Sequence, residues 1–269
     1  DAVPALIQLA AHESNATLLR AVFVALQPFD NPDIADTAIK RLTSLPGSAR
    51  PAALSLLTSR SIFATSLVRA VRDGKLPTEI IPPEFARRLK SYADDAMMGG
   101  IEQLWPKSGR PTSADMNREI TRPTDALNEG HGDPYAGKRL FTTSCAACHV
   151  LFNQGGDIGP DLTSLNRRDQ PALLLAIVNP SAEIRECYEN FSVSMKDGRF
   201  LAGFIAEQDE RKVILHGFDG QNVVLQRGDI LEINAAGISL MPEGLTTTLD
   251  DQQARDLFAY LRSSQPLNE

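Results

Sequence analysis

Cysteine and histidine are scarce in this chain, and its uninterrupted apolar stretches are short. Three cysteines and four histidines occur among 269 residues, and three cysteines are too few for a fold built on disulfides. No run of about 18 apolar residues occurs, so the sequence predicts no membrane span. Apolar residues make up 42% and charged residues 23%, which is typical of a globular chain with one large domain or two ordinary ones.

A surplus of basic residues is also missing. Residues 1–130 carry 15 Lys and Arg against 15 Asp and Glu, whereas residues 131–269 carry 12 against 19, so the second half holds the whole net charge of −7. We therefore do not expect nucleic acid as a partner, because phosphate binding requires a basic face. The acidic half suits a partner with a basic docking patch, and a solvated acidic surface is the alternative.

Residues 1–105 show helical periodicity in short segments that end at proline, glycine or asparagine. Asn15 and Asn31 are expected N-caps, and Pro32 suits a first helical position. Short helices with short breaks predict stacked pairs that resemble HEAT-type repeats, with a plain helical bundle as the alternative because no repeat sequence recurs. Residues 106–132 are polar and contain several prolines and glycines, and we interpret them as a connector with at most one short helix.

The scarce residues are concentrated at one place. Cys145, Cys148 and His149 lie within five positions, at the end of a predicted helix that begins after Asp133. C-x-x-C-H is the attachment signature of c-type haem, in which both cysteines form thioethers and the histidine binds the iron. Thiols three residues apart on a helix lie nearly one above the other, which matches two substituents on one edge of a porphyrin.

Two other chemistries use closely spaced cysteines. A thioredoxin-like dithiol usually follows a strand and needs no histidine, whereas these cysteines end a predicted helix. A zinc site needs a fourth ligand, and the sequence has no second pair of cysteines. We therefore predict one covalently bound haem c at this motif.

The sequence after the motif predicts the rest of a second domain over residues 133–269. "GGDIGPDL" supplies a Gly-rich turn, and a helix follows after Asp169. Alternating residues with turn signals over about 190–235 predict four or five short strands. The last helix, at about 249–263, has an apolar stripe, and Gly137 is expected to allow the first helix of this domain to approach it closely.

A covalent haem usually needs a sixth ligand, for which the chain offers methionines and histidines. Met241 lies in the loop before the last helix, and Pro242 stiffens the backbone beside it. Met195 and His216 lie in predicted strands, where a structural role is sufficient. The remaining candidates are Met97, Met98, Met116, His12 and His131.

Several linked motifs resemble one family. GK-x-LF-x-x-x-C-x-x-CH, GPDL, NPSAEI, DGR, SLMPEGL and a final LFAYL are similar to the haem-binding domain typical of planctomycetes and verrucomicrobia, in the class I cytochrome c superfamily. The resemblance covers about residues 131–269. It implies a class I cytochrome c fold with a β insertion between its third helix and its methionine loop.

The resemblance also assigns roles to particular residues. It implies His149 and Met241 as the two axial ligands of the iron. It implies that the Pro160 carbonyl accepts a hydrogen bond from the His149 ring, and a simple turn at Gly159 and Pro160 is the alternative. Gly159 and Phe141 belong to the motifs that this family uses around its haem.

We therefore predict a mainly α protein, with a HEAT-like domain at 1–105, a connector at 106–132 and a cytochrome c domain at 133–269. Cys187 lies outside the motif and is expected to be a buried thiol, with an intermolecular disulfide as the alternative. The chain begins with Asp1 and shows no export signal, so we expect a processed or excised piece of an exported, for example periplasmic, protein.

The predicted function is electron transfer rather than enzymatic catalysis. The resemblance implies a C-terminal redox module of a larger protein, in which helical repeats and a sugar-dehydrogenase-like propeller often lie upstream. Its partner would be a redox protein or that upstream dehydrogenase domain. A haem enzyme or ligand sensor with an open sixth site, and a helical docking scaffold with an auxiliary haem, are the alternatives, and a homo-oligomer is left open.

Overall fold

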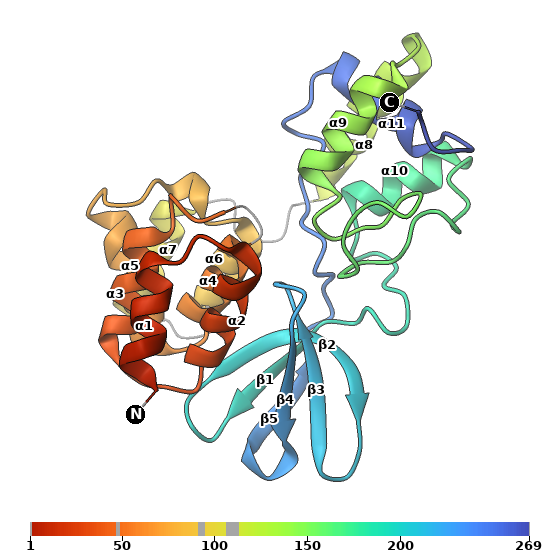
Figure 1. Cartoon of the computed structure of the whole chain (residues 1–269). Coiled ribbons are helices and arrows are strands. Elements are labelled where there is room, and N and C mark those ends of the chain that lie inside the picture. Colours follow the sequence, from red (N-terminus) through yellow and green to blue (C-terminus); the bar gives the residue numbers. More distant parts are fainter. Residues whose placement is uncertain (1, 47–48, 91–94, 106–112, 269) are drawn as a thin grey trace. The chain divides into compact units, whose positions relative to one another are not determined.

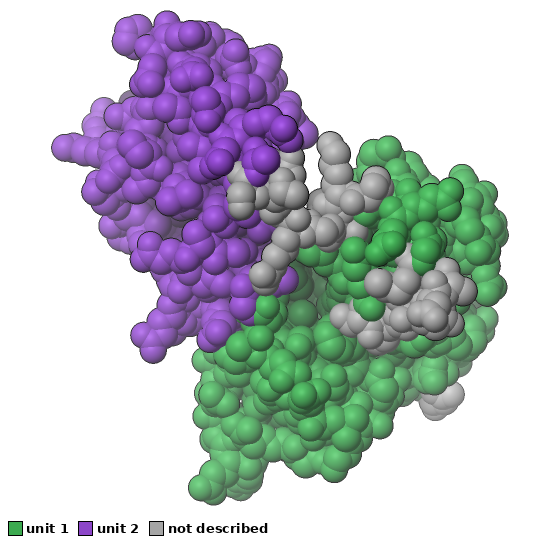
Figure 2. All heavy atoms as spheres, turned by 180° about the vertical axis from the view of Figure 1, so that it is seen from behind, with its two compact units in different colours: residues 1–110, 190–236 green, residues 111–189, 237–269 purple. Residues whose placement is uncertain are grey.

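The structure, a computed structural model, describes residues 2–46, 49–90, 95–105 and 113–268. The chain divides into two compact units (Figure 2): unit 1 comprises residues 1–110 and 190–236, and unit 2 comprises residues 111–189 and 237–269. Each unit is built from two separate stretches of sequence, so the chain passes three times from one unit to the other.

Short helices form the first stretch of unit 1 (Figure 1). They are α1 (Val3–His12), α2 (Ala16–Leu26), α3 (Pro32–Arg41), α4 (Arg50–Leu57), α5 (Ser61–Arg72), α6 (Pro83–Leu89) and α7 (Asp95–Leu104), with a 3₁₀ turn at Thr78–Ile80. The predicted caps are confirmed, because the side chains of Asn15 and Asn31 accept main-chain N–H groups at the starts of α2 and α3. Helix α1 packs on α2 and α3, α2 on α4, α3 on α5, and α5 on α7. Within the described residues, none of the helices has the length and apolarity that a membrane crossing requires.

The second stretch of unit 1 is an antiparallel sheet in the order β4-β3-β2-β1-β5. Its strands are β1 (Phe191–Met195), β2 (Phe200–Gln208), β3 (Lys212–Gly217), β4 (Asn222–Gln226) and β5 (Ile230–Ala235). The strands and their turns are as the sequence predicted. Gly198 and Gly220 provide the turns after β1 and β3, with φ of +82° and +70° that other residues rarely adopt.

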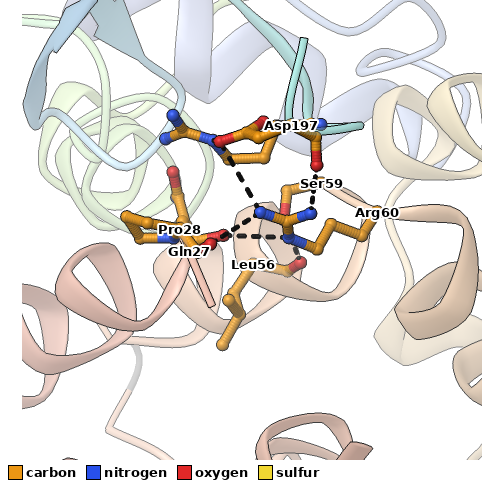
Figure 3. Close-up of polar contacts among 7 residues, drawn as sticks. Gln27, Pro28, Leu56, Ser59, Arg60 and Asp197 are labelled. Atoms are coloured by element: carbon orange, nitrogen blue, oxygen red, sulfur yellow. Dashed lines mark hydrogen bonds and ion pairs between the residues drawn. The ribbon is translucent and has the colours of Figure 1, made fainter. Parts of the chain in front are cut away.

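Arg60, the residue before α5, ties the sheet to the helices of unit 1 (Figure 3). Its side chain is 6% exposed. The guanidinium donates to the main-chain oxygens of Gln27 at 3.1 Å and Pro28 at 2.8 Å, and to that of Asp197 in the β1–β2 turn at 2.6 Å. The ion pair with the Asp197 carboxylate, at 3.7 Å, adds less because that carboxylate is 41% exposed.

Two further arginines make similar contacts. Arg20 of α2 donates to the main-chain oxygen of Asp219 at 2.5 Å, and Arg88 of α6 donates to that of Phe200. The Phe200 N–H in turn donates to the Ser59 carbonyl at 2.8 Å. We predicted that the strands belong with the haem-binding part, between whose helices they lie in the sequence. In the structure, these hydrogen bonds join them to the helical part of unit 1.

Unit 2 is helical. Its helices are α8 (Ser113–Glu129), α9 (Pro134–Ser144), α10 (Gln170–Val178) and α11 (Asp251–Leu261). Helix α11 crosses α9 and packs on α8, and α8 also packs on α10. We interpreted 106–132 as a polar connector that could contain one short helix, but α8 is a helix of 17 residues with Pro123 inside it. Ile120 and Leu127 pack against the buried Leu174 and Phe258, and this burial offsets the roughly 3 kcal/mol that an interior proline costs a helix.

Candidate haem site

Helices α9 and α11 form the base of the site. The Asp133 N–H donates to the Asp256 carboxylate at 2.8 Å, which fixes the start of α9 against α11. A Cβ added to Gly137 would lie only 1.9 Å from the Asp256 carbonyl oxygen, so the predicted close approach at this glycine is confirmed. One turn later the rings of Phe141 and Tyr260 lie 5.5 Å apart.

The C-x-x-C-H motif forms a turn at the end of α9. We predicted a helix through the second cysteine, but α9 ends at Ser144 and both cysteines lie in the turn that follows. The Cys145 carbonyl accepts the His149 N–H at 3.0 Å. The Cys148 carbonyl accepts the Gly159 N–H at 2.7 Å. The Gly-rich loop thus folds back onto the motif. The N–H of Gly159 occupies a carbonyl that a continuing helix would have bonded within itself.

The His149 ring is held by Pro160. Its Nδ1 lies 2.9 Å from the Pro160 carbonyl oxygen. A carbonyl oxygen can only accept a hydrogen bond, so Nδ1 is the protonated nitrogen of the ring. This is the contact that the family resemblance implied, rather than a simple turn. Burial lowers the pKa of His149, and the hydrogen bond to Pro160 opposes that shift. The ring is therefore neutral at pH 7, with the Nε2 lone pair free to bind a metal.

Gly159 packs directly against this ring. A Cβ at that position would lie 2.6 Å from Cε1 and 2.8 Å from Nδ1 of His149. Carbon contacts this short do not occur between unbonded atoms, and the ring cannot swing away without losing the Pro160 hydrogen bond. Only glycine fits beside the histidine in this orientation.

Gly159→Ala is therefore expected to displace the His149 ring and to lower the yield of low-spin haem protein severalfold. Overpacking of this kind typically costs about 1–3 kcal/mol of stability. Gly228→Ala is the matched control, because a Cβ there meets nothing within 4 Å. The absorption spectrum of each purified variant, oxidised and reduced, gives the measurement. A normal low-spin spectrum from Gly159→Ala would show that the ring has another orientation.

The Cys145 thiol lies in an apolar environment. It packs against the cluster that contains Phe141 and Leu151. Burial, and then the neighbouring Cys148, raises the pKa of Cys145 to about 11. A redox dithiol needs a low thiol pKa, so this environment argues against the thioredoxin-like alternative. It suits an uncharged thioether, and this fits covalent haem. No group of three His, Cys, Asp or Glu side chains that could hold a metal ion occurs in the described ranges, which gives zinc no ligand set there.

Residues 135–215 match the cytochrome c family model. The match contains both motif cysteines, His149 and Pro160, and it ends before Met241. It supports a class I cytochrome c domain that binds haem and transfers electrons. Haem is covalently bound in such domains and is normally attached outside the cytoplasm. No curated protein matches the chain.

Met241 lies beyond the matched part of the cytochrome c domain, in the loop before α11. It is half-buried, and its N–H donates to the Ser239 hydroxyl at 3.1 Å. The Ser239 N–H donates to the Ser181 hydroxyl at 3.1 Å, and Ser181 follows α10. These bonds attach the Met241 loop to the α10 side of unit 2, the same unit that holds His149.

The other candidate ligands have structural surroundings. Met195 is 2% exposed in the core of the sheet, and Nδ1 of His216 lies 2.7 Å from the Asn222 side-chain oxygen. Met97 packs against the core of the helical part of unit 1. His12 is exposed at the end of α1, and His131 is exposed in the loop before α9. Met116 is half-buried in α8, and the Met98 side chain lies outside the described residues.

Cys187 differs from our expectation. We predicted a buried thiol, but Cys187 is exposed and free, with a φ of +73°. It lies in the irregular segment between α10 and β1, which contributes little to the core of the cytochrome c domain.

Sequence reasoning also missed Phe152 and Arg167 beside the motif, because neither belongs to a periodic pattern or to a motif that we recognised.

Proposed function

We propose that the chain is an electron-transfer cytochrome with one covalently bound haem c. Cys145 and Cys148 are the attachment residues, and His149 and Met241 are the axial ligands. The observation that carries the proposal is the His149 ring, whose Nδ1 is bonded to Pro160 while Nε2 is left for the iron. The C-x-x-C-H turn and the family match support the same reading.

The haem supplies one-electron chemistry when it is bound, because its iron alternates between the ferric and ferrous states. The role of the protein is to keep both axial ligands in place, so that little rearranges when an electron arrives. His149 is neutral and fixed by a main-chain acceptor. A filled sixth site leaves no position for a substrate, and this is why we propose a carrier rather than an enzyme.

An absorption spectrum of the purified protein tests this function. We expect the sharp bands of a low-spin c-type haem after reduction, and the colour should stay with the protein after extraction with acidified acetone. A colourless protein, or haem that is fully extracted, contradicts the proposal. A ferric spectrum of the high-spin type would instead favour the haem enzyme or ligand sensor with an open sixth site.

We further propose that unit 1 is a HEAT-like array in an exported protein, of which the cytochrome c domain is the C-terminal redox module. The support is the packing of each of the first helices on the next but one, α1 on α3, α2 on α4 and α3 on α5. Unit 1 has no net charge, with 18 Lys and Arg against 18 Asp and Glu.

Charge is concentrated in the unit that contains His149. Unit 2 has nine Lys and Arg against 16 Asp and Glu, a difference of −7 that equals the net charge of the whole chain. An excess of one sign on a redox domain attracts partners of the opposite sign and accelerates their encounter. We propose a redox partner, or an upstream dehydrogenase domain, with a basic docking patch.

The salt dependence of electron exchange tests this charge. Reduction of the ferric protein by a cationic ruthenium ammine complex should slow by about threefold to tenfold as ionic strength rises, because exposed charges are screened over about 10 Å at 0.1 M. Oxidation of the ferrous protein by an anionic iron(III) cyanide complex is the control and should accelerate instead. Stopped-flow absorbance gives both rates. If neither rate of electron exchange changes with ionic strength, the acidic charge of unit 2 serves solubility rather than docking.

A further inference from the structure

Arg167 is a buried cation in the turn before α10. It is 9% exposed. Its Nη1 donates to the main-chain oxygens of Leu261 at 2.5 Å and Ser263 at 2.8 Å, at the C-terminal end of α11. The last carbonyl groups of a helix lack partners within the helix, and a positive charge there is favoured by the helix dipole. One side of the guanidinium is therefore attached to α11.

The segment after His149 has a strained backbone beside this guanidinium. Phe152 has a φ of +55°, in the left-handed region that costs a residue other than glycine about 1–2 kcal/mol. Its N–H donates to the Thr163 hydroxyl at 2.8 Å. Its ring lies 5.1 Å from the guanidinium carbon of Arg167 and 6.4 Å from the Tyr260 ring. A strained conformation persists only where its surroundings impose it, and Arg167 is part of those surroundings.

The same arginine reaches the segment that carries Pro160. Nη2 of Arg167 lies 3.4 Å from the main-chain oxygen of Thr163, three residues after the proline. The Thr163 N–H donates to the Asp161 carboxylate at 2.7 Å, which closes this segment into a turn. Arg167 thus contacts both the segment that follows His149 and the segment that supplies the acceptor for its ring.

We propose that Arg167 is the positioning residue that fixes the orientation of the His149 ring, by holding these two segments against the end of α11. The inference rests on the proposed function, in which Nε2 of that ring binds the iron. Arginine suits the task because its planar guanidinium donates in several directions while it lies flat on an aromatic ring. A lysine would keep the positive charge, but its ammonium group has neither the several fixed N–H donors nor the planar face of a guanidinium.

Hydrogen exchange of the His149 ring tests the role of Arg167. NMR of the reduced holoprotein in deuterated water gives the exchange rate of the Nδ1 proton. In Arg167→Lys this proton should exchange about tenfold faster, which corresponds to a weakening of the ring's hydrogen bond by about 1.4 kcal/mol. Arg168→Gln is the matched control, because Arg168 is the exposed neighbour and its loss should leave the rate unchanged. The amide of Ala254, which donates to the carbonyl of the N-cap residue Asp250, reports the opening of α11.

Two results would overturn the role of Arg167. One is an unchanged rate of ring exchange in Arg167→Lys, and the other is an acceleration that the Ala254 amide matches, because this would show only general destabilisation. If Arg167→Lys does not fold, Thr163→Val removes the acceptor of the Phe152 N–H and should accelerate ring exchange in the same way. Absence of covalent haem from the unmodified protein would refute the proposed function, whereas haem with unchanged ring exchange refutes only the role of Arg167.

Discussion

Replacement of Cys145 and Cys148 by alanine is expected to abolish covalently attached haem. Each thioether forms when a thiol adds across a vinyl group, so a chain that has neither thiol cannot form a bond to the porphyrin. The apolar surroundings that raise the pKa of Cys145 to about 11 keep this thiol uncharged. A neutral thioether can replace it there without burying a charge.

Haem that resists acidified acetone gives the measurement for this double variant. We expect it to fall from one per chain to a background level, while each single variant keeps one thioether and some bound haem. Cys187→Ala is the matched control, because Cys187 is the third cysteine and is exposed and free. Covalent haem that survives in the double variant, or that disappears in Cys187→Ala, would place the attachment elsewhere.

Substitution of Met241 is expected to change the reduction potential and the spin state of the iron. A thioether ligand favours ferrous iron and an imidazole favours ferric iron. Met241→His should therefore lower the potential by a sizeable part of the roughly 0.8 V that axial ligands span. Met241→Ala should admit water, so that the ferric iron becomes high-spin and binds cyanide faster.

Potentiometric titration and the ferric absorption spectrum measure these effects of Met241. Met195→Leu is the control, because Met195 is buried in the sheet and leucine conserves its volume. This control should leave both the potential and the spectrum unchanged. If Met241→Ala keeps a low-spin spectrum of the methionine type, a different residue is the sixth ligand, and the loop before α11 has another function.

Local features of the fold were predictable because they depend on short-range chemistry. Asn15 caps α2 through its own side chain, and the glycines after β1 and β3 lie where the backbone needs a positive φ. The motif around His149 was also readable, because a c-type haem requires its attachment residues at fixed spacing. The acceptor at Pro160 followed from the resemblance and not from the residues alone.

Long-range features were not predictable in the same way. The sheet joins the helical part of unit 1 through single arginines such as Arg60, whose contacts with main-chain oxygens have no sequence pattern. Helix α8 contains Pro123 and reads as a loop, yet burial against α10 and α11 stabilises it. Phe152 adopts a left-handed conformation in contact with Thr163 and Arg167, and no propensity of phenylalanine indicates it.

The two-part construction of unit 2 has a consequence for the order of events during synthesis. Residues 111–189 leave the ribosome before the sheet of unit 1, and residues 237–269 with Met241 and α11 follow the sheet. The motif cysteines are thus available before the helix that covers Phe141 exists. Residues 237–269 can complete unit 2 only through contacts between distant parts of the chain, and contacts of this kind slow folding.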